Sequence, residues 1–519
     1  MTAQQDTPGR DGPRQYLGWQ GEKVAFIFGL SGQRAAFIAA AVLAAIWPIA
    51  VSQPAEGLVL WPLAALLAAA AFVRVAGRTA DEWAAAAISW SLVALRGQHK
   101  FASAAFTPAS KADPAGPPPM DLPGILAPLK ILTAGDGPDA IAVVRNARER
   151  TCTAVARVQV PGIGLVDSAR RDQRVSGWGA LLASLCRENH PVTRVQALQR
   201  IVPESGASLR QWHAGHLDPD APALAADVTS GLLATSTLAS SQRESYLAFT
   251  MDERRAAGQI KAAGGGEAGA CAVLTRHLRA LGPVISGADL RIAGWLAPRD
   301  LAEVIRTAFD PHSSRELDAR RAAWQAATQA GQEPQGLAPG VTPAAAGPAA
   351  AQADPGRYAH DGAVSVTYWV QDWPRHQVYA TALMPLLAES LHRRSFSLHA
   401  EPLGPRTAER SVMRERTARD VAVRMRQRTG QVIPEHERQA MARAQAQDAE
   451  RAAGHGLVRF TGYVTVTVTD PSQVDDACAA LEADAAAAGI DARRMWFAQD
   501  VGFAVSALPL GMGIPRKRW

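Results

Sequence analysis

The 519-residue sequence contains no Gly-Lys dipeptide, which excludes a P-loop of the Gly-x4-Gly-Lys-Ser/Thr type. It also lacks a Gly-x-Ser-x-Gly elbow and a His-Glu-x-x-His pair, two common patterns of hydrolytic enzymes. Gly162 and Gly164 lack the third glycine of a dinucleotide fingerprint, so we interpret them as part of a turn. These absences predict a protein that is not an enzyme and binds no cofactor.

Cysteine is scarce, and its spacing supports no metal site. The four cysteines lie far apart and form no Cys-x-x-Cys pair: Cys152, Cys186, Cys271 and Cys478. We therefore expect free thiols and neither a zinc site nor a disulfide framework. His213 and His216 are spaced like two metal ligands on one helix face. Prolines interrupt the residues that follow, which favours a polar surface loop without a metal.

Net charge is modest, at +6 with an isoelectric point of about 9.3. This excess suits an anionic lipid surface and does not require nucleic acid. Eight arginines gather in residues 406–428, and four are candidates to contact DNA, lipid or an acidic partner: Arg414, Arg424, Arg426 and Arg428. The segment lacks interleaved aromatic residues for base stacking, which favours a solvated helical hairpin instead.

Long apolar runs occur only near the start of the chain. Residues 35–51 and 58–73 contain no charged residue, and six residues separate them. A helix rises about 1.5 Å per residue, so each run nearly matches a ~30 Å hydrocarbon core. The pattern predicts an N-terminal two-helix transmembrane hairpin. The alternative is an alanine-rich helical hairpin buried in a soluble core.

The charges around the two apolar runs predict their orientation. The connection between the runs carries only Glu56. Basic residues flank the runs on the other side: Arg10, Arg14, Lys23, Arg34, Arg74, Arg78, Arg96 and Lys100. Because Lys and Arg stay on the cytoplasmic side, we expect a cell-membrane protein with both termini in the cytoplasm. Trp47 and Trp61 lie near the connection, where indole rings favour the membrane interface.

The second apolar run is followed by an amphipathic segment that reaches Leu95. We expect this segment to form an interfacial helix, with Trp83 at the depth of the lipid headgroups. Composition then divides the chain as follows: a disordered N-terminus at 1–22, the hairpin and interfacial helix at 23–102, a Pro-rich linker at 103–120, a first cytoplasmic domain at 121–330, an Ala/Pro/Gly-rich linker at 331–357 and a second domain at 358–519.

Alternating strand and helix patterns predict an α+β body. In the first domain we expect strands at 140–144, 151–158, 192–202, 246–251 and 289–295, and helices at 167–186, 223–233, 268–281 and 298–309. In the second domain we expect strands at 364–369, 395–400, 460–468 and 492–497, helices at 379–391 and 471–488, and a long charged helical insertion at 407–453. The Val/Thr alternation at 464–468 predicts a half-buried strand. The order strand, helix, strand, strand, helix, strand is that of a ferredoxin-like fold, and we expect two such halves.

The hairpin and the sequence after it, Gly-Arg-Thr-Ala-Asp-Glu-Trp at 77–83, resemble the small PrgI-like inner-membrane proteins of conjugative type IV secretion systems. The body from residue 122 is similar to the non-motor N-terminal part of the secretion ATPase of those machines. Four segments carry that likeness: 122–129, 365–369, 457–468 and 507–511. The fusion of both parts looks like membrane proteins of actinobacterial integrative and conjugative elements.

The resemblance implies a non-enzymatic scaffold at the inner-membrane base of a transfer machine. Its expected partners are the lipid bilayer, a separate motor ATPase, other membrane proteins of the complex and further copies of the chain. A core membrane component of a type VII secretion apparatus is the nearest alternative, because it also joins two membrane helices to a cytoplasmic α/β domain. A membrane-tethered enzyme with an unrecognised site is the alternative of a different class.

Overall fold

The structure is a computed structural model of the chain. It describes residues 2–3, 16–17, 32–51, 54–72, 74–75, 78–104, 120–159, 166–203, 207–218, 220–236, 241–332, 338–374, 378–414, 417 and 456–513. Within the expected disordered N-terminus, β1 (Thr2–Ala3) pairs with β2 (Tyr16–Leu17). Most of the predicted Pro-rich linker lies outside the described residues.

One antiparallel sheet forms the body, and the described residues supply 13 strands to it. The strands are β5 (Lys100–Ala102), β6 (Leu129–Ala134), β7 (Ile141–Asn146), β8 (Thr151–Gln159), β9 (Val192–Pro203), β10 (Ser241–Asp252), β11 (Arg291–Trp295), β12 (Ala350–Ala353), β13 (Tyr358–His360), β14 (Ala363–Asp372), β15 (Arg393–Leu403), β16 (Leu457–Val468) and β17 (Asp491–Arg494). The main path runs β5-β12-β13-β14-β16-β15-β9-β10-β8-β7-β6, while β11 pairs with β8 and β17 pairs with β14. The protein is therefore a mixed α/β structure built on a large antiparallel sheet.

The sheet contains the same arrangement of elements twice. The first half consists of β8, α4 (Ser168–Leu185), β9, β10, α8 (Gly266–Gly287) and β11, and the second of β14, α11 (Met384–Leu387), β15, β16, α14 (Val474–Ala487) and β17. In both halves the four strands lie side by side in the order fourth, first, third, second. The two second strands, β9 and β15, pair with each other from Ile201 and Arg394 to Val195 and Ala400. The halves are therefore joined through seven paired positions into one continuous sheet.

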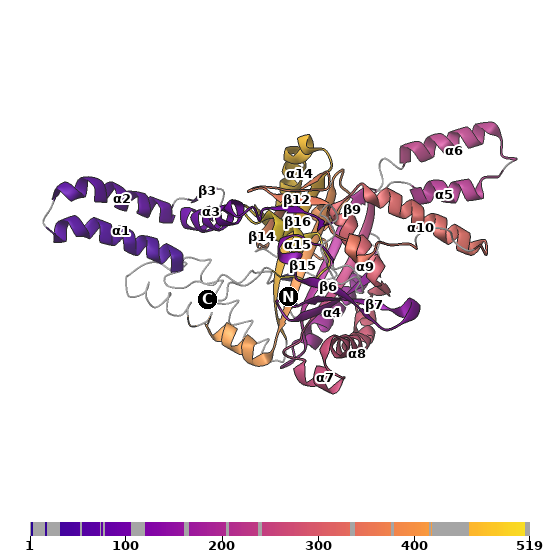
Figure 1. The fold of residues 1–519 in the computed structure, drawn as a ribbon, viewed down its shortest axis with the longest axis horizontal. Helices are drawn as coiled ribbons and strands as arrows, with labels where there is room; N and C mark the ends of the chain where they lie inside the picture. Colours follow the sequence, from indigo (N-terminus) through magenta and orange to yellow (C-terminus); the bar gives the residue numbers. More distant parts are fainter. Residues whose placement is uncertain are drawn as a thin grey trace, which may run out of the picture.

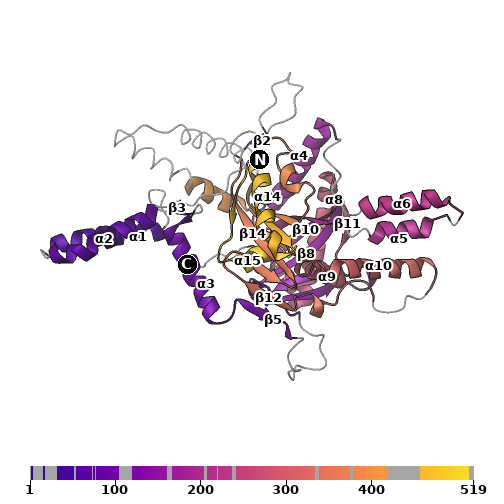
Figure 2. The same ribbon diagram turned by 90° about the horizontal axis from the view of Figure 1, so that it is seen from above.

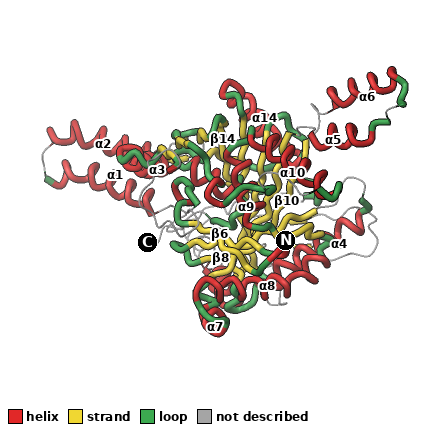
Figure 3. The backbone as a smooth tube through the Cα atoms, turned by 45° about the vertical axis from the view of Figure 1, so that its right-hand side comes forward, coloured by secondary structure: helices red, strands yellow, loops and turns green. Residues whose placement is uncertain are grey.

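Helices cover both faces of the sheet, so the strands lie in the middle of the body (Figure 3). On one face, α4 and α8 pack on the first half, and α11 and α14 pack on the second half. On the other face, α9 (Pro298–Phe309), α15 (Gln499–Ser506) and residues 507–512 form a core that spans both halves. Since residues 507–512 pack against strands of the first half, the end of the described chain helps to hold the halves together.

Local side-chain hydrogen bonds stabilise the start of α4 and the turn between β7 and β8. The side chain of Asp167 accepts the backbone N–H of Arg170 at 2.8 Å, which caps the start of α4. The Asn146 side chain accepts the backbone N–H groups of Arg148 and Glu149 in the turn between β7 and β8. The strands and helices expected in the first domain are all present, and further elements join them there, among them β6, α5 (Ala207–His216), α7 (Ala257–Ala262) and α10 (Ser313–Gln329).

The strand β16 differs from its prediction, because its second half, residues 462–468, is buried on both faces. Val464, Val466 and Val468 face α14, as expected for the apolar side of a half-buried strand. Thr465 and Thr467 are also buried, since α15 covers the opposite face. Thr465 is hydrogen-bonded to Thr367 and Thr467 to Ser365, each at an oxygen–oxygen distance of 2.8 Å. Paired hydroxyl groups therefore let a polar strand face enter the core.

Three further segments differ from expectation. Residues 350–353 of the predicted 331–357 linker form β12, which pairs with β5 and β13 and places Ala351 in the core. The predicted helix at 379–391 is reduced to α11, which carries Pro385 and ends after one turn. Within the predicted charged insertion, residues 405–414 are helical, and nearly all of the rest lies outside the described residues.

Two pairs of helices project from the body at opposite ends of its longest axis (Figures 1 and 2). One pair is α1 (Gly32–Ala50) with α2 (Pro54–Phe72), which α3 (Ala80–Leu95) connects to the sheet through β5. The other is α5 with α6 (Ala223–Ser236), inserted between β9 and β10. The predicted N-terminal helical hairpin is thus present, and it stands apart from the sheet.

Candidate functional site

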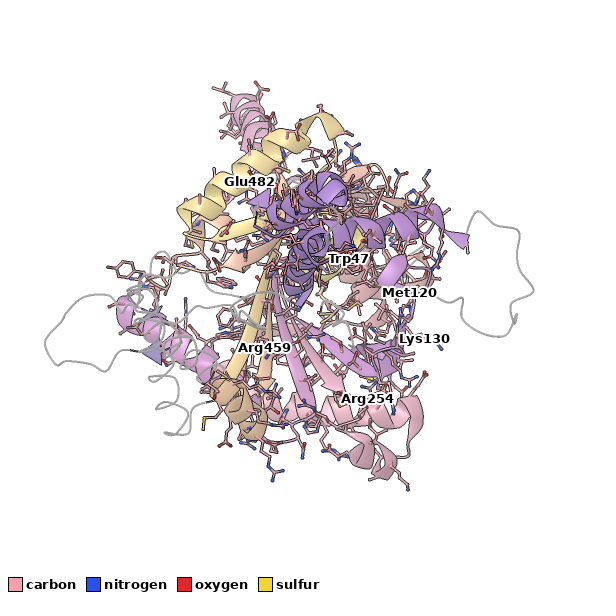
Figure 4. The ribbon with its side chains drawn as sticks, turned by 90° about the vertical axis from the view of Figure 1, so that its left-hand side faces the viewer. Trp47, Met120, Lys130, Arg254, Arg459 and Glu482 are labelled. Carbon is pink, nitrogen blue, oxygen red and sulfur yellow. The ribbon has the colours of Figure 1, made fainter. Side chains whose placement is uncertain are left out.

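The hairpin of α1 and α2 carries large apolar side chains on its outside. We call the following exposed residues the hairpin surface: Val42, Leu43, Ile46, Trp47, Ile49, Val51, Leu58, Val59, Trp61, Leu63 and Leu66. Leu58 is 83% exposed, although a leucine normally lies inside a folded protein. Figure 4 looks onto this end of the molecule, where Trp47 lies on the hairpin that points toward the viewer. An exposed apolar patch of this kind marks a contact with lipid or with another protein.

Small residues fill the inside of the same hairpin. Ala41 of α1 is 7% exposed and Ala64 of α2 is 8% exposed. The indole nitrogen of Trp61 donates a hydrogen bond across the hairpin to the Ala45 carbonyl at 3.3 Å. A side chain at Gly57 would meet the Trp61 ring at 3.2 Å, so the glycine makes room for the indole. The closest approach of the two helices therefore involves small residues, while most of the large apolar side chains point outward.

Helix α3 has two different faces. Its apolar residues Ile88, Leu92 and Leu95 are exposed. On its other side, the Trp83 ring lies 5.8 Å from the ring of Trp496, and the Trp90 ring lies 5.9 Å from that of Phe497. The Trp83 ring therefore packs on the body, and its position at the depth of the lipid headgroups stays a prediction. Sequence patterns predicted the helix and its aromatic residues, but not the aromatic residues of the body that they contact.

The contact between α3 and the body is closely fitted around Trp496 and Phe497. The Arg494 guanidinium lies 4.7 Å from the centre of the Trp496 ring, and its Nε donates to the Gly356 carbonyl at 2.8 Å. A side chain at Gly356 would meet the Trp496 ring at 2.5 Å. Phe497 has a φ of 63°, a left-handed conformation that costs a bulky residue roughly 1–2 kcal/mol. We call this contact the α3 joint, and it fixes where the hairpin leaves the sheet.

The structure brings only some of the predicted membrane residues together. Trp47 and Trp61 are both exposed on the hairpin, as an interfacial role requires. Arg74 and Arg78 lie on β3 (Arg74–Val75) and β4 (Arg78–Thr79), two short strands that pair with each other between α2 and α3. Both arginines therefore belong to the connection between the hairpin and the α3 joint.

Across the ranges that the structure describes, no helix has both the length and the apolar character needed to cross a membrane. The predicted helical hairpin is present, but its two predicted membrane spans lack support from these residues.

The other candidate residues do not form a site in the described part of the chain. Arg414 is exposed at the end of the helical residues 405–414, whereas Arg424, Arg426 and Arg428 lie outside the described residues. His213 and His216 lie in the last turn of helix α5, so the expected surface loop is wrong at these residues, and the His216 ring stacks on Trp212 at 4.5 Å. Among the described residues, no group of three or more His, Cys, Asp or Glu side chains could hold a metal ion.

A buried polar network joins the two halves of the sheet, and sequence patterns did not identify it. The Gln196 side chain of β9 donates to Ser397 Oγ of β15 and to the Leu508 carbonyl, both at 2.9 Å, and accepts the Gly511 N–H at 2.7 Å. Next to it, Arg194 donates to the Gly511 carbonyl at 2.8 Å and pairs with Glu401. Residues 507–511 supply backbone partners to this network, and they thereby cover the junction between the two halves of the sheet. The alternation of Ser395, Ser397 and His399 on one strand face was its only sequence signal.

Two buried histidines lie on the same side of the sheet. His399 Nε2 is 3.0 Å from Ser397 Oγ and 2.9 Å from the Val505 carbonyl. His360 Nε2 is 2.8 Å from Ser365 Oγ, and its Nδ1 is hydrogen-bonded to the Phe309 carbonyl. Burial lowers the pKa of each imidazole to about 4, so both are neutral at pH 7. Neutral rings hydrogen-bonded to buried partners serve structure here, since neither faces an opening to solvent.

A comparison with models of protein families gives no match for this chain, and a comparison with curated proteins gives none either.

Proposed function

We propose that this protein is a non-enzymatic scaffold that the α1–α2 hairpin anchors in the cell membrane. One observation carries the proposal: the hairpin buries Ala41 and Ala64 between its helices and exposes most of its described leucine, isoleucine, valine and tryptophan side chains. Water would penalise that surface by about 25 cal/mol for each Å² of apolar area, whereas lipid would not. The exposed residues of α3 lie beside the hairpin and extend the apolar surface toward the body.

The hairpin enters the membrane from the cytoplasmic side and returns to it. Three basic residues precede α1, Arg34 lies in its first turn, four basic residues follow α2 as far as Lys100, and the connection between the two helices carries only Glu56. Both termini and the sheet body then lie in the cytoplasm. The α3 joint and β5 hold the body at a fixed position relative to the bilayer, because they connect the hairpin directly to the sheet edge.

The body serves a conjugative type IV secretion-like machine by holding a separate motor ATPase and other membrane proteins of the complex. Support comes from the sequence resemblance and from the absence of a P-loop, since this chain cannot supply the motor itself. The repeated strand order fourth, first, third, second fits two ferredoxin-like halves. Sheet edges and faces of such halves accept elements of partner proteins.

Purification of the full-length chain in a mild detergent tests this function. We expect a P-loop ATPase and conjugation membrane proteins to copurify with it. Copurification of type VII secretion components would replace the proposed machine with the other secretion apparatus. The purified chain should hydrolyse no nucleotide, and robust turnover that persists after removal of the ATPase would contradict a scaffold.

A further inference from the structure

The helix α6 at the far end of the molecule exposes a second apolar surface. Leu224, Val228 and Leu232 recur every four residues, so they form one stripe along the helix, and all three are exposed. Helix α5 lies beside α10, and α6 lies on the side of α5 that faces away from α10 (Figures 1 and 2). A 14-residue helix is marginal in water unless its apolar face is packed. The stripe therefore needs a partner that covers it.

The position of α6 argues against lipid as that partner. The α1–α2 hairpin and α6 lie at opposite ends of the longest axis, as two perpendicular views show (Figures 1 and 2). A bilayer that contains the hairpin cannot reach α6 of the same molecule. Because this argument uses the membrane anchor, the inference rests on the proposed function.

We propose that the stripe pairs with the same stripe of a second copy of this chain. A twofold axis at Val228 places Leu224 against Leu232 of the second copy, and Leu232 against its Leu224, in an antiparallel helix pair. The order Leu, Val, Leu at equal spacing reads the same from either end, so the surface is complementary to itself. Helix α6 carries a single charged residue, Asp227, and that residue lies beside the stripe.

Charge favours the same antiparallel arrangement. The connection between α5 and α6 exposes Asp218 and Asp220 at the tip of the projection. The strand that follows α6 exposes Arg243 at the base of the projection. Antiparallel pairing brings the acidic tip of each copy toward the basic base of the other.

The membrane anchor makes such a small contact sufficient. One helix per chain buries less than the ~1,200 Å² typical of stable complexes in solution. Anchoring in a bilayer confines the copies to a surface and raises their effective concentration, which allows a weak contact to persist. The pairing sites of neighbouring copies would then meet on the cytoplasmic side, away from the membrane.

Cysteine cross-linking of the full-length chain in native membranes tests the pairing. The four natural cysteines are buried, so a short bismaleimide should react mainly with introduced thiols. We expect Val228→Cys to give covalent dimers and Ser230→Cys to give none, because Ser230 is exposed on the opposite side of the same helix. Mixed Leu224→Cys and Leu232→Cys chains should join to each other and not to themselves. Val228→Asp should abolish the Leu224–Leu232 cross-link, whereas Ser230→Asp should leave it unchanged.

Three results would overturn the pairing. One is a Val228→Cys chain that reacts with a monofunctional maleimide yet forms no dimer. Another is equal cross-linking at positions 228 and 230, and the third is a cross-link to a different protein. The same samples also test the pairing independently of the membrane anchor, because Val228→Asp should abolish pairing and still leave the chain in the membrane fraction. Loss of every variant from that fraction would contradict the anchor and not the pairing.

Discussion

The sheet body and the α1–α2 hairpin bury opposite kinds of residue. The body encloses Gln196, Ser397 and His399 between its two halves, while the hairpin encloses alanines and exposes leucines. Gln196, Ser397 and His399 are stable inside the body because each side chain makes hydrogen bonds to buried partners there. The large apolar groups of the hairpin are exposed instead, and the proposed anchor gives them lipid as a partner.

The largest expected effect concerns the outside of the hairpin. Leu58→Lys combined with Leu66→Lys should reduce flotation of the purified chain with liposomes to background. Each charge placed in lipid costs roughly 2.5–3.5 kcal/mol, so the pair should lower partitioning by several orders of magnitude. Leu391→Lys is the matched control, because Leu391 is 91% exposed on the body. Equal flotation of the double variant and the control would remove the distinction between the two surfaces.

The second prediction concerns the polar interior of the body. Gln196→Ala leaves the Gly511 N–H and the Leu508 carbonyl without their Gln196 partner, while Ser397 keeps its hydrogen bond to His399. We expect the free energy of unfolding, measured with urea, to fall by roughly 3–5 kcal/mol. Gln242→Ala, at an exposed position on β10, should change it by less than about 0.5 kcal/mol. A neutral Gln196→Ala would mean that the network does not hold the halves together.

The pH dependence of stability tests the buried histidines of the same polar interior. The pKa values of His360 and His399 are lowered to about 4, chiefly by burial and to a smaller extent by Arg393 and Arg194. The unfolded chain takes up these protons near pH 6.5, so it binds more protons than the folded chain between pH 6.5 and 4. Stability should therefore decrease as the pH is lowered from 6.5 to 4, by about 3 kcal/mol for each histidine.

Chemical unfolding at a series of pH values measures this dependence. His399→Gln should flatten the curve between pH 6.5 and 4, whereas the exposed His312→Gln should leave its slope unchanged. An unaltered slope in His399→Gln would show that this imidazole is charged in the folded protein.

The smallest effect concerns the α3 joint, where the two regions meet. Gly356→Ala pushes a methyl group into the Trp496 ring and should cost about 1–3 kcal/mol of stability. Hydrogen exchange should then accelerate in residues 83–95 more than in the sheet. Gly258→Ala is the control, because a side chain there meets no atom within 4 Å. Uniform exchange in both variants would show that Gly356 does not position α3.

Local patterns predicted most elements of the fold. Asp167 predicted the start of α4, and the Val/Thr alternation predicted β16, because both signals act over a few neighbouring residues. The single sheet was not predicted, since β9 and β15 are almost two hundred residues apart and their pairing has no local signature. The covered threonine face of β16 escaped prediction for the same reason: α15, which buries it, follows later in the chain.

The sequence predicted which residues form the hairpin, but not which residues of the body contact α3. The charge-free runs and Trp47 identified the exposed hairpin, because hydropathy is a property of a continuous segment. The contact between Trp83 and the body was not predicted, since an aromatic residue on an amphipathic helix gives no indication of which apolar partner it meets. Trp496 and Phe497 supply that partner from the opposite end of the sequence.

Extraction of membranes from cells that produce the full-length chain tests the central claim most directly. The membranes are washed with alkaline carbonate, and the sediment and the supernatant are compared by immunoblot. A hairpin buried in lipid predicts that the chain stays in the sediment and is released only by detergent. Complete recovery of the chain in the aqueous supernatant would contradict the anchor.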